Sequence, residues 1–239
     1  MKKLVYGALV LLLCSNIAFA MGGPAPSPTD DSEPVIELGQ EYVLDDFESG
    51  SLRSPREWWT FDIKTADIAD NAALTAGEKE TAAKVGKYSL ALKGSAKDWY
   101  VGGCGTYVAE EGKDLSGYNA FQIDVYGAGP GSGTLKIELL DDDNNNWQVE
   151  QDPAKSYAPI YDDKLVYEVN VDWIGWKKIT ILLDDFVDDN DGVGDDIWNP
   201  SQRDGSGGFL QIQFVCLATK DTGSVNFNID NITLTTEEE

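Results

Sequence analysis

Short stretches in which every second residue is apolar constrain this chain more than any other feature. They are Phe121–Val125, Leu135–Leu139, Ile179–Leu183, Leu210–Cys216 and Val225–Ile232. A period of two places the apolar side chains on one face of a β-strand, whereas a helix needs a period of 3.6. Clusters of Gly, Asn, Asp or Pro bound each stretch, as is typical of the turns between strands. The sequence therefore predicts an all-β fold of antiparallel strands, each with one buried and one wet side.

The length and the spacing of these strands bear on the architecture. About ten such strands in one domain predict an antiparallel β-sandwich, and the length favours a jelly roll. We expect one domain over residues 42–236 and an acidic tail at 237–239. Residues 21–41 predict a flexible linker, because their prolines, glycines, serines and acids cannot bury enough apolar surface to fold.

Residues 1–20 have the composition of a secretory signal peptide. Lys2 and Lys3 precede a short apolar run, and Ala18-Phe19-Ala20 supplies the small residues that signal peptidase reads. Cys14 raises the alternative of a lipoprotein signal, but Leu13 stands where that signal needs a small residue. We expect cleavage after Ala20 and an exported protein in the periplasm, at the cell surface or in the medium. The apolar run is too short to predict insertion in a membrane.

Charge and the lack of histidine exclude several kinds of function. The chain has 42 acidic and 18 basic residues, a net charge of −24 that signal removal would take to about −26. Such a surface repels nucleic acid, because phosphate binding depends on lysine and arginine. Without histidine the chain lacks the commonest general base and the usual ligand of zinc. We expect no catalytic residues and no nucleic-acid partner.

Cys104 and Cys216 are the cysteines that follow the signal segment. In an oxidising compartment such a pair forms a disulfide in many proteins. The alternative is two buried thiols in strands, since free cysteine packs as a small hydrophobe. The sequence leaves both open.

The aromatic residues indicate a ligand. The chain has seven tryptophans and ten tyrosines, more than a β core of this size needs. Indole and phenol rings stack on the C–H faces of sugars, while sugar hydroxyls need paired hydrogen-bond donors and acceptors. For Trp58, Trp59, Trp173 and Trp176 packing in the core or at its rim is the favoured interpretation. The candidate carbohydrate-binding residues combine aromatic groups near polar loops with polar groups on the wet faces of strands: Trp99, Tyr100, Tyr107, Glu138, Trp147, Tyr157, Tyr161, Gln211 and Gln213.

The order of several motifs resembles a known family. The motifs are Leu44–Glu48, Gly86–Leu92, Asp114–Asn119 leading into Phe121–Gly127, Gly175–Ile179, Leu182–Phe186, Trp198–Pro200 and Ile229–Ile232. Together they resemble galactose-binding-like jelly rolls, and in particular the group shared by family 11 carbohydrate-binding modules and complex I intermediate-associated protein 30 domains. The resemblance covers roughly residues 42 to 236. It implies a jelly-roll fold, whose functions range over glycan binding, assembly and structural roles.

The same resemblance implies a structural calcium ion. Related modules hold calcium with acids from the first and last strands and with backbone carbonyls between them. The matching positions are Asp46, Glu48, the Lys87 backbone and Asp230, and hard oxygen ligands suit calcium. The alternative is that these acids cap strand ends and face solvent.

Two further acidic runs are interpreted as loops. Asp184–Asp196 resembles the calcium loops of EF-hands and dockerins, but with Gly192 in the turn position Val187 falls where the first ligand is needed. An acidic solvated loop is therefore favoured. Asp141–Asn146 lacks the glycine and predicts a hairpin connection, since Asp and Asn tolerate tight turns.

Three functions remain open from the sequence. The first is non-catalytic binding of a polysaccharide or cell-surface glycan, favoured by the motif series and the aromatic residues. The second is a structural or protein-interaction module of the cell envelope without glycan affinity. The third is a glycan-cleaving enzyme, because two carboxylates can catalyse hydrolysis without histidine. With 42 acids in the chain, finding two together does not distinguish this third function.

Overall fold

The computed structural model describes residues 37–74, 83–96, 98–201, 208–219 and 223–238. The predicted signal peptide at 1–20 and most of the predicted linker at 21–41 lie outside these ranges. The first strand, β1, begins at Glu41. Just before it, the Gly39 amide donates to the carbonyl of Thr236, the residue that follows the last strand, at 3.1 Å. In the described ranges no helix is both long enough and apolar enough to cross a membrane.

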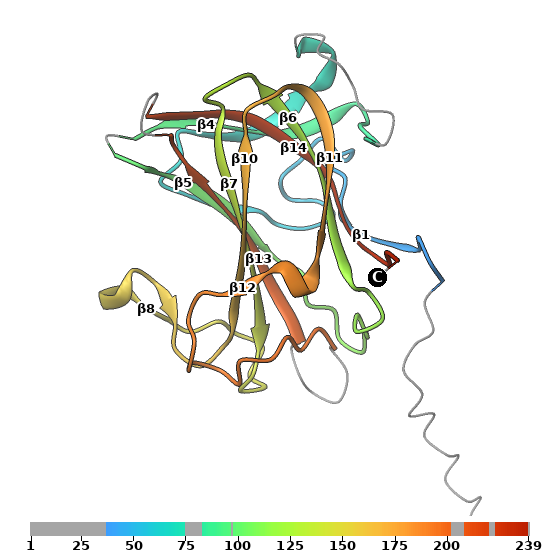
Figure 1. The fold of residues 1–239 in the computed structure, drawn as a ribbon, viewed down its shortest axis with the longest axis vertical. Coiled ribbons are helices and arrows are strands. Elements are labelled where there is room, and N and C mark those ends of the chain that lie inside the picture. Colours follow the sequence, from blue (N-terminus) through green and yellow to red (C-terminus); the bar gives the residue numbers. More distant parts are fainter. Residues whose placement is uncertain (1–36, 75–82, 97, 202–207, 220–222, 239) are drawn as a thin grey trace, which may run out of the picture. The chain divides into compact units, whose positions relative to one another are not determined.

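Two six-stranded antiparallel sheets form the described part of the chain (Figure 1). Sheet A contains β11 (Ile174–Leu182), β6 (Ala120–Ala128), β14 (Ser224–Thr235), β4 (Tyr88–Ser95) and β3 (Thr65–Asp70), with β1 (Glu41–Asp45) paired to β14. Sheet B contains β12 (Val187–Asp188), β10 (Lys164–Val171), β7 (Gly133–Asp142), β13 (Gly208–Leu217), β5 (Tyr100–Tyr107) and β2 (Trp59–Phe61). A small ladder joins β8 (Gln151–Asp152) to β9 (Ala158–Pro159), and single 3-10 turns span Asn71–Ala73, Pro153–Lys155 and Leu183–Asp185.

The longer strands follow jelly-roll connectivity. Along the chain β4 leads to β5, β6 to β7, β10 to β11 and β13 to β14, and each step passes from one sheet to the other. The resulting orders, β4-β14-β6-β11 and β5-β13-β7-β10, are those of the two facing sheets of a jelly roll. The predicted all-β antiparallel sandwich is confirmed.

The core lies between the two sheets and follows the predicted alternation. Phe121, Ile123 and Val125 of β6 are fully buried, as are Leu135 and Ile137 of β7. Alternate residues of the same strands face away from the core. A bulge in β14 between Asp230 and Thr233 shifts the alternation, so that Ile229 and Ile232 both enter the core although they are three residues apart.

Both cysteines are free thiols in this core. Cys104 in β5 and Cys216 in β13 are fully buried on neighbouring strands. Burial raises the pKa of Cys104 well above its usual value and that of Cys216 to about 12. Of the two alternatives left open by the sequence, the structure has the two buried thiols, and both residues pack as apolar groups.

Candidate functional site

A groove of about 1080 Å³ crosses the outer face of sheet B. Its floor comes from β10, β7, β13 and β5, whose inner faces bury the core. The side chains that line it are Trp59, Phe61, Asp62, Trp99, Tyr100, Tyr107, Lys136, Glu138, Leu140, Val149, Gln151, Ser156, Tyr157, Lys164, Glu168, Gln211, Gln213, Val215 and Leu217. The groove exceeds a typical small-molecule pocket, which holds about 300–1,000 Å³, and suits an extended ligand.

The register of the strands arranges the polar side chains of the floor in rows that run across the sheet. In one row Glu138 of β7 lies opposite Gln213 of β13, and Gln213 lies opposite Gly105 of β5. In the next row Gln211 lies between Leu140 and Tyr107. Residues two apart on a strand share a face, so Gln211 and Gln213 present adjacent amides, each with a donor and an acceptor.

The two lysines of the floor are held by ion pairs. The Lys136 ammonium lies 3.1 Å from Glu138 and 2.9 Å from Asp189, and Lys164 lies 2.9 Å from Asp189. Burial works against the charge of Lys136, but Asp189 and Glu138 raise its pKa above the usual value. Burial likewise opposes ionisation of Asp189, but Lys136 and Lys164 hold its pKa below the usual value. Lys136 and Asp189 are therefore both charged at neutral pH and hold each other in place.

One wall of the groove is aromatic and depends on two glycines. A Cβ atom on Gly105 would lie 2.7 Å from the Trp59 ring, and one on Gly103 would lie 2.7 Å from the Phe61 ring. Both rings therefore lie against the bare backbone of β5, which is the strand that pairs with β2. The Trp59 ring also packs against Tyr107, with centroids 5.4 Å apart.

Trp99 and Tyr100 extend the same wall. Their ring centroids are 5.9 Å apart in an edge-to-face arrangement, and Trp99 is 60% exposed. The Tyr100 hydroxyl donates a hydrogen bond to Asp62 at 3.0 Å. Burial and this hydrogen bond raise the pKa of Tyr100 to about 12, so the phenol stays neutral. The pair offers apolar ring surface with fixed polar edges.

The opposite wall comes from the segment between β7 and β10. Val149, Gln151, Ser156 and Tyr157 line the groove from this segment, which contains β8 and β9. Its label β8 stands beside the lower end of sheet B in Figure 1. Ser156 and Tyr157 have positive φ values of 58° and 61°, and the Tyr157 amide donates to the Asp152 carbonyl at 2.9 Å. This turn leaves the Tyr157 side chain 64% exposed.

Most of the predicted carbohydrate-binding residues come together in this groove. Its lining includes Trp99, Tyr100, Tyr107, Glu138, Tyr157, Gln211 and Gln213. Trp147 and Tyr161 do not line it. Trp147 sits in the turn after β7, where its amide donates to Asp142 at 2.7 Å.

Sequence reasoning missed part of the lining. The sequence favours packing for Trp59, but its ring lines the groove. The other three tryptophans with this interpretation do pack in or against buried clusters: Trp58, Trp173 and Trp176. Lys136 was also missed, although it lies on the same wet face of its strand as Glu138. The alternation that selected Glu138 was a sufficient signal for Lys136.

The residues of the expected calcium site are only partly brought together. Glu48 accepts a hydrogen bond from the Tyr88 amide at 2.8 Å, and Asp230 accepts one from the Gly86 amide at 3.4 Å. Asp46 is exposed, and its carboxylate accepts from the Glu48 amide at 3.1 Å. The Lys87 carbonyl accepts from the Asn71 amide at 2.9 Å. Glu48 and Asp230 thus flank one backbone segment.

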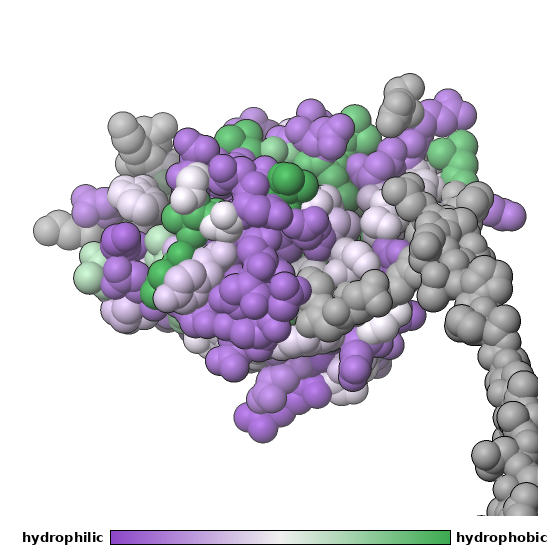
Figure 2. Space-filling model, turned by 90° about the horizontal axis from the view of Figure 1, so that it is seen from below, coloured by the Kyte–Doolittle hydropathy of each residue, from purple (hydrophilic) through white to green (hydrophobic). Residues whose placement is uncertain are grey.

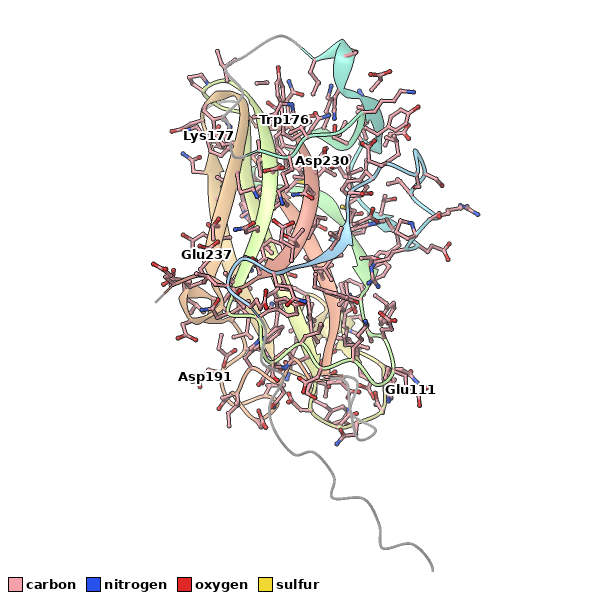
Figure 3. The ribbon with its side chains drawn as sticks, turned by 90° about the vertical axis from the view of Figure 1, so that its right-hand side faces the viewer. Glu111, Trp176, Lys177, Asp191, Asp230 and Glu237 are labelled. Atoms are coloured by element: carbon pink, nitrogen blue, oxygen red, sulfur yellow. The ribbon has the colours of Figure 1, made fainter. Side chains whose placement is uncertain are left out.

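Two other groups of acids bring their oxygens within 4.8 Å of one another among the described residues. The first, Asp141, Asp143 and Asp163, is largely buried and could hold a metal ion. The second, Asp188, Asp191 and Asp196, belongs to the acidic loop and is mostly exposed. Figure 3 labels Asp230 and Asp191 toward opposite ends of the sandwich.

Comparisons with known proteins concern the fold. No protein-family model matches the sequence, and no curated protein matches it. The structure is similar to a family 11 carbohydrate-binding module from Clostridium thermocellum solved in complex with a β-1,3-1,4-mixed-linked tetrasaccharide. That match has 21% identity, covers 85% of this chain and 99% of the module, and has a TM-score of 0.48.

Two further solved modules from Clostridium thermocellum are also similar. The family 11 module of the cellulase Lic26A-Cel5E has 20% identity over 85% of this chain and 98% of its own, with a TM-score of 0.47. A family 30 module of the cellulase Cel9D-Cel44B has 14% identity over 84% of this chain and 99% of its own, with a TM-score of 0.46. The strand order itself makes the chain a jelly-roll β-sandwich, and one of its sheets carries a groove with aromatic walls and a polar floor.

Proposed function

We propose that this protein binds a polysaccharide chain in the groove of sheet B and performs no chemistry on it. The observation that carries the proposal is the pairing of aromatic walls, Trp59 and Trp99 on one side and Tyr157 on the other, with a floor of fixed polar groups. A sugar ring has apolar faces and a polar rim. Rings in the walls complement the faces, while Gln211 and Gln213 complement the hydroxyls.

The shape of the groove supports an extended ligand rather than a single sugar. Its floor crosses four strands, and neighbouring strands lie about 4.8 Å apart. The floor therefore spans more than ten ångströms, which is more than one sugar ring. Several sugars of one chain can contact the floor at once.

The acidic groups of the groove support binding without cleavage. Glycoside hydrolysis uses one carboxyl group as a proton donor and a second as nucleophile or base. The Glu138 carboxylate is engaged in an ion pair with the Lys136 ammonium, which lies 3.1 Å away. Incubation with a bound polysaccharide should release no reducing ends, and release would favour the enzyme alternative.

We also propose that a structural calcium ion binds between Glu48 and Asp230. Asp230 is 1% exposed, and burial together with the charges of Asp124 and Glu48 raises its pKa to about 8. A cation at this place would relieve the cost of that buried carboxylate. Calcium binding that persists unchanged in Asp230→Asn would contradict this assignment.

The test of the proposed function is a binding screen. The protein without residues 1–36 is run in native gels that contain neutral polysaccharides, among them a β-1,3-1,4-mixed-linked glucan, and hits are titrated by calorimetry. Retardation by at least one polysaccharide, with saturable heat of binding, is expected. Retardation by none of them would favour the envelope-interaction alternative.

We further propose that the protein is exported, because residues 1–20 have the composition of a signal peptide. An intact N-terminus on protein recovered from cells would contradict export.

A further inference from the structure

Three aspartates gather where three chain segments meet at one end of sheet B. Asp141 is the last but one residue of β7, Asp143 directly follows that strand, and Asp163 directly precedes β10. Since Leu140 and Lys164 are paired in the ladder of β7 and β10, Asp141 and Asp163 are neighbours across it. A third segment, residues 194–199, closes over them from the chain between β12 and β13.

Each of these carboxylates has one oxygen fixed by a backbone amide. Asp141 Oδ2 accepts from the Asn199 amide at 2.6 Å, and Asp163 Oδ2 accepts from the Ile197 amide at 2.9 Å. Asp143 Oδ2 accepts from the Asp163 amide at 2.9 Å. These bonds hold the three groups in place and fix their orientation.

The other oxygen of each carboxylate is buried and has no hydrogen-bond partner in the described structure. These atoms are Asp141 Oδ1, Asp143 Oδ1 and Asp163 Oδ1. Asp141 is 0% exposed and Asp163 is 1% exposed, so water does not satisfy them freely. Buried polar atoms are nearly always paired, so unpaired oxygens on three carboxylates that approach within 4.8 Å of one another indicate a missing ligand.

Among the described residues, no ion pair compensates the charge of the group. The ion pairs found there join Lys84 and Lys178 to Glu41, and Lys136 and Lys164 to Glu138 or Asp189. None of them reaches the three aspartates. Burial, with repulsion from the neighbouring acids, raises the pKa of Asp141 to about 8 and that of Asp163 to about 6. Burying carboxylates together without a cation is costly.

The backbone is shaped around the group at Gly194. This residue has a φ of +81°, and a Cβ atom there would lie 2.0 Å from Asp163 Oδ1 and 2.4 Å from Asp143 Oδ2. The loop therefore approaches the carboxylates more closely than any residue with a side chain allows. Figure 2 shows the end of the molecule seen from below, where mainly hydrophilic residues form the outer surface.

We propose that Asp141, Asp143 and Asp163 bind one calcium ion that ties these three segments together. Three carboxylates supply hard oxygen ligands, and calcium accepts the irregular geometry that loops provide, whereas magnesium requires a near-ideal octahedron. The ion closes the base of the segment from Asp143 to Asp163, which carries the Tyr157 wall of the groove. The exposed group of Asp188, Asp191 and Asp196 has no comparable buried oxygens and is not included.

The test measures calcium binding by the protein without glycan, so that it is independent of the proposed function. Equilibrium dialysis with calcium and thermal melts in calcium and in EGTA are run on the wild type and on Asp163→Asn. The amide keeps the shape and an acceptor for the Ile197 amide but removes the charge. We expect Asp163→Asn to bind one calcium ion fewer per chain than the wild type. Its melting temperature in EGTA should equal or exceed that of the wild type, because an uncompensated buried charge is gone.

Saturating calcium should raise the melting temperature of the wild type by about 5 to 10 °C if it binds only the folded state. Asp163→Asn should lose the part of this rise that the site provides, while the matched control Asp191→Asn should keep all of it. If Asp163→Asn does not fold, Asp143→Asn replaces it in both measurements, because Asp143 is less buried. Equal calcium stoichiometry in the wild type and in a folded variant would overturn the proposal. Terbium luminescence sensitised by Trp198, next to two of the amide donors, gives an independent measure of the same site.

Discussion

Two consecutive tryptophans show how one residue step separates core from groove. The Trp58 ring is buried and stacks on Phe214 with centroids 5.7 Å apart, while its indole nitrogen donates to Asp45 at 2.8 Å. The Trp59 ring lies on the other side, over Gly105 in the groove wall. The same residue type therefore packs in the core at one position and lines the groove at the next.

Replacement of Trp59 by alanine should weaken polysaccharide binding and leave the fold intact. An aromatic residue at the centre of a binding surface contributes about 2 kcal/mol, which corresponds to an affinity about 30-fold weaker. Calorimetric titration with the polysaccharide found by screening measures the loss. Trp58→Ala is the matched contrast: it should lower the free energy of unfolding by about 3–5 kcal/mol, measured by denaturant titration.

Gly105→Ala tests the support beneath the Trp59 ring. The new Cβ would lie 2.7 Å from that ring and 3.0 Å from the Ile212 carbonyl, so the ring must move off the β5 backbone. We expect weaker polysaccharide binding, with a smaller loss than Trp59→Ala causes, because the ring is displaced rather than removed. A calorimetric affinity equal to that of the wild type would show that the position of the ring does not matter.

At the scale of elements, the segment between β7 and β10 carries two tyrosines that the sequence does not distinguish but that lie in different places. Tyr157 is 64% exposed and lines the groove, whereas Tyr161 is 54% exposed and does not. Both side chains are solvent-accessible, so removing either should change the melting temperature little. Their difference in position isolates the contribution of the groove.

Tyr157→Ala should therefore weaken polysaccharide binding, while Tyr161→Ala should not. Tyr157 lines the groove and Tyr161 does not, so a difference in binding between the two variants reports on this wall. Affinity electrophoresis on the same gel compares them directly. Equal retardation of the two variants would place the ligand away from this wall.

The sequence predicts many of the strands, but it predicts much less of the groove that the pairing of these strands creates. Alternation identified β6, β7, β11, β13 and β14 because each presents one apolar face, and the same rule selected Glu138, Gln211 and Gln213 for the wet face. Alternation excludes a register shift of one residue, which would turn the apolar face outward, but not a shift of two, so it does not predict the rows of the floor. β2 has three residues and β5 contains glycines, so neither gives a strong strand pattern.

The buried aspartates show a second limit of the sequence. Asp141 and Asp143 belong to a run of polar residues that is typical of a turn, and Asp163 lies far along the chain. No local spacing marks them as a group, because the β7–β10 ladder brings them together. Burial of their carboxylates is a tertiary property that a polar run does not reveal.

At the scale of the whole molecule, the net charge of −24 restricts the ligand. Long-range repulsion disfavours polyanions, while an uncharged polysaccharide feels no net force. The Debye length falls from about 10 Å at 0.1 M salt to 3 Å at 1 M, so salt screens such repulsion. We expect affinity for a neutral polysaccharide to change less than about twofold between 0.05 and 0.5 M sodium chloride. A steep dependence on salt, measured by calorimetry, would indicate a charged ligand.

The central claim is that the groove of sheet B binds a polysaccharide. The most direct test is calorimetric titration of one polysaccharide into wild-type protein, Trp59→Ala and Tyr161→Ala under identical conditions. We expect saturable binding by the wild type and by Tyr161→Ala, and binding about 30-fold weaker by Trp59→Ala. Equal affinity of Trp59→Ala and the wild type, with melting temperatures unchanged, would place the ligand elsewhere and contradict the account.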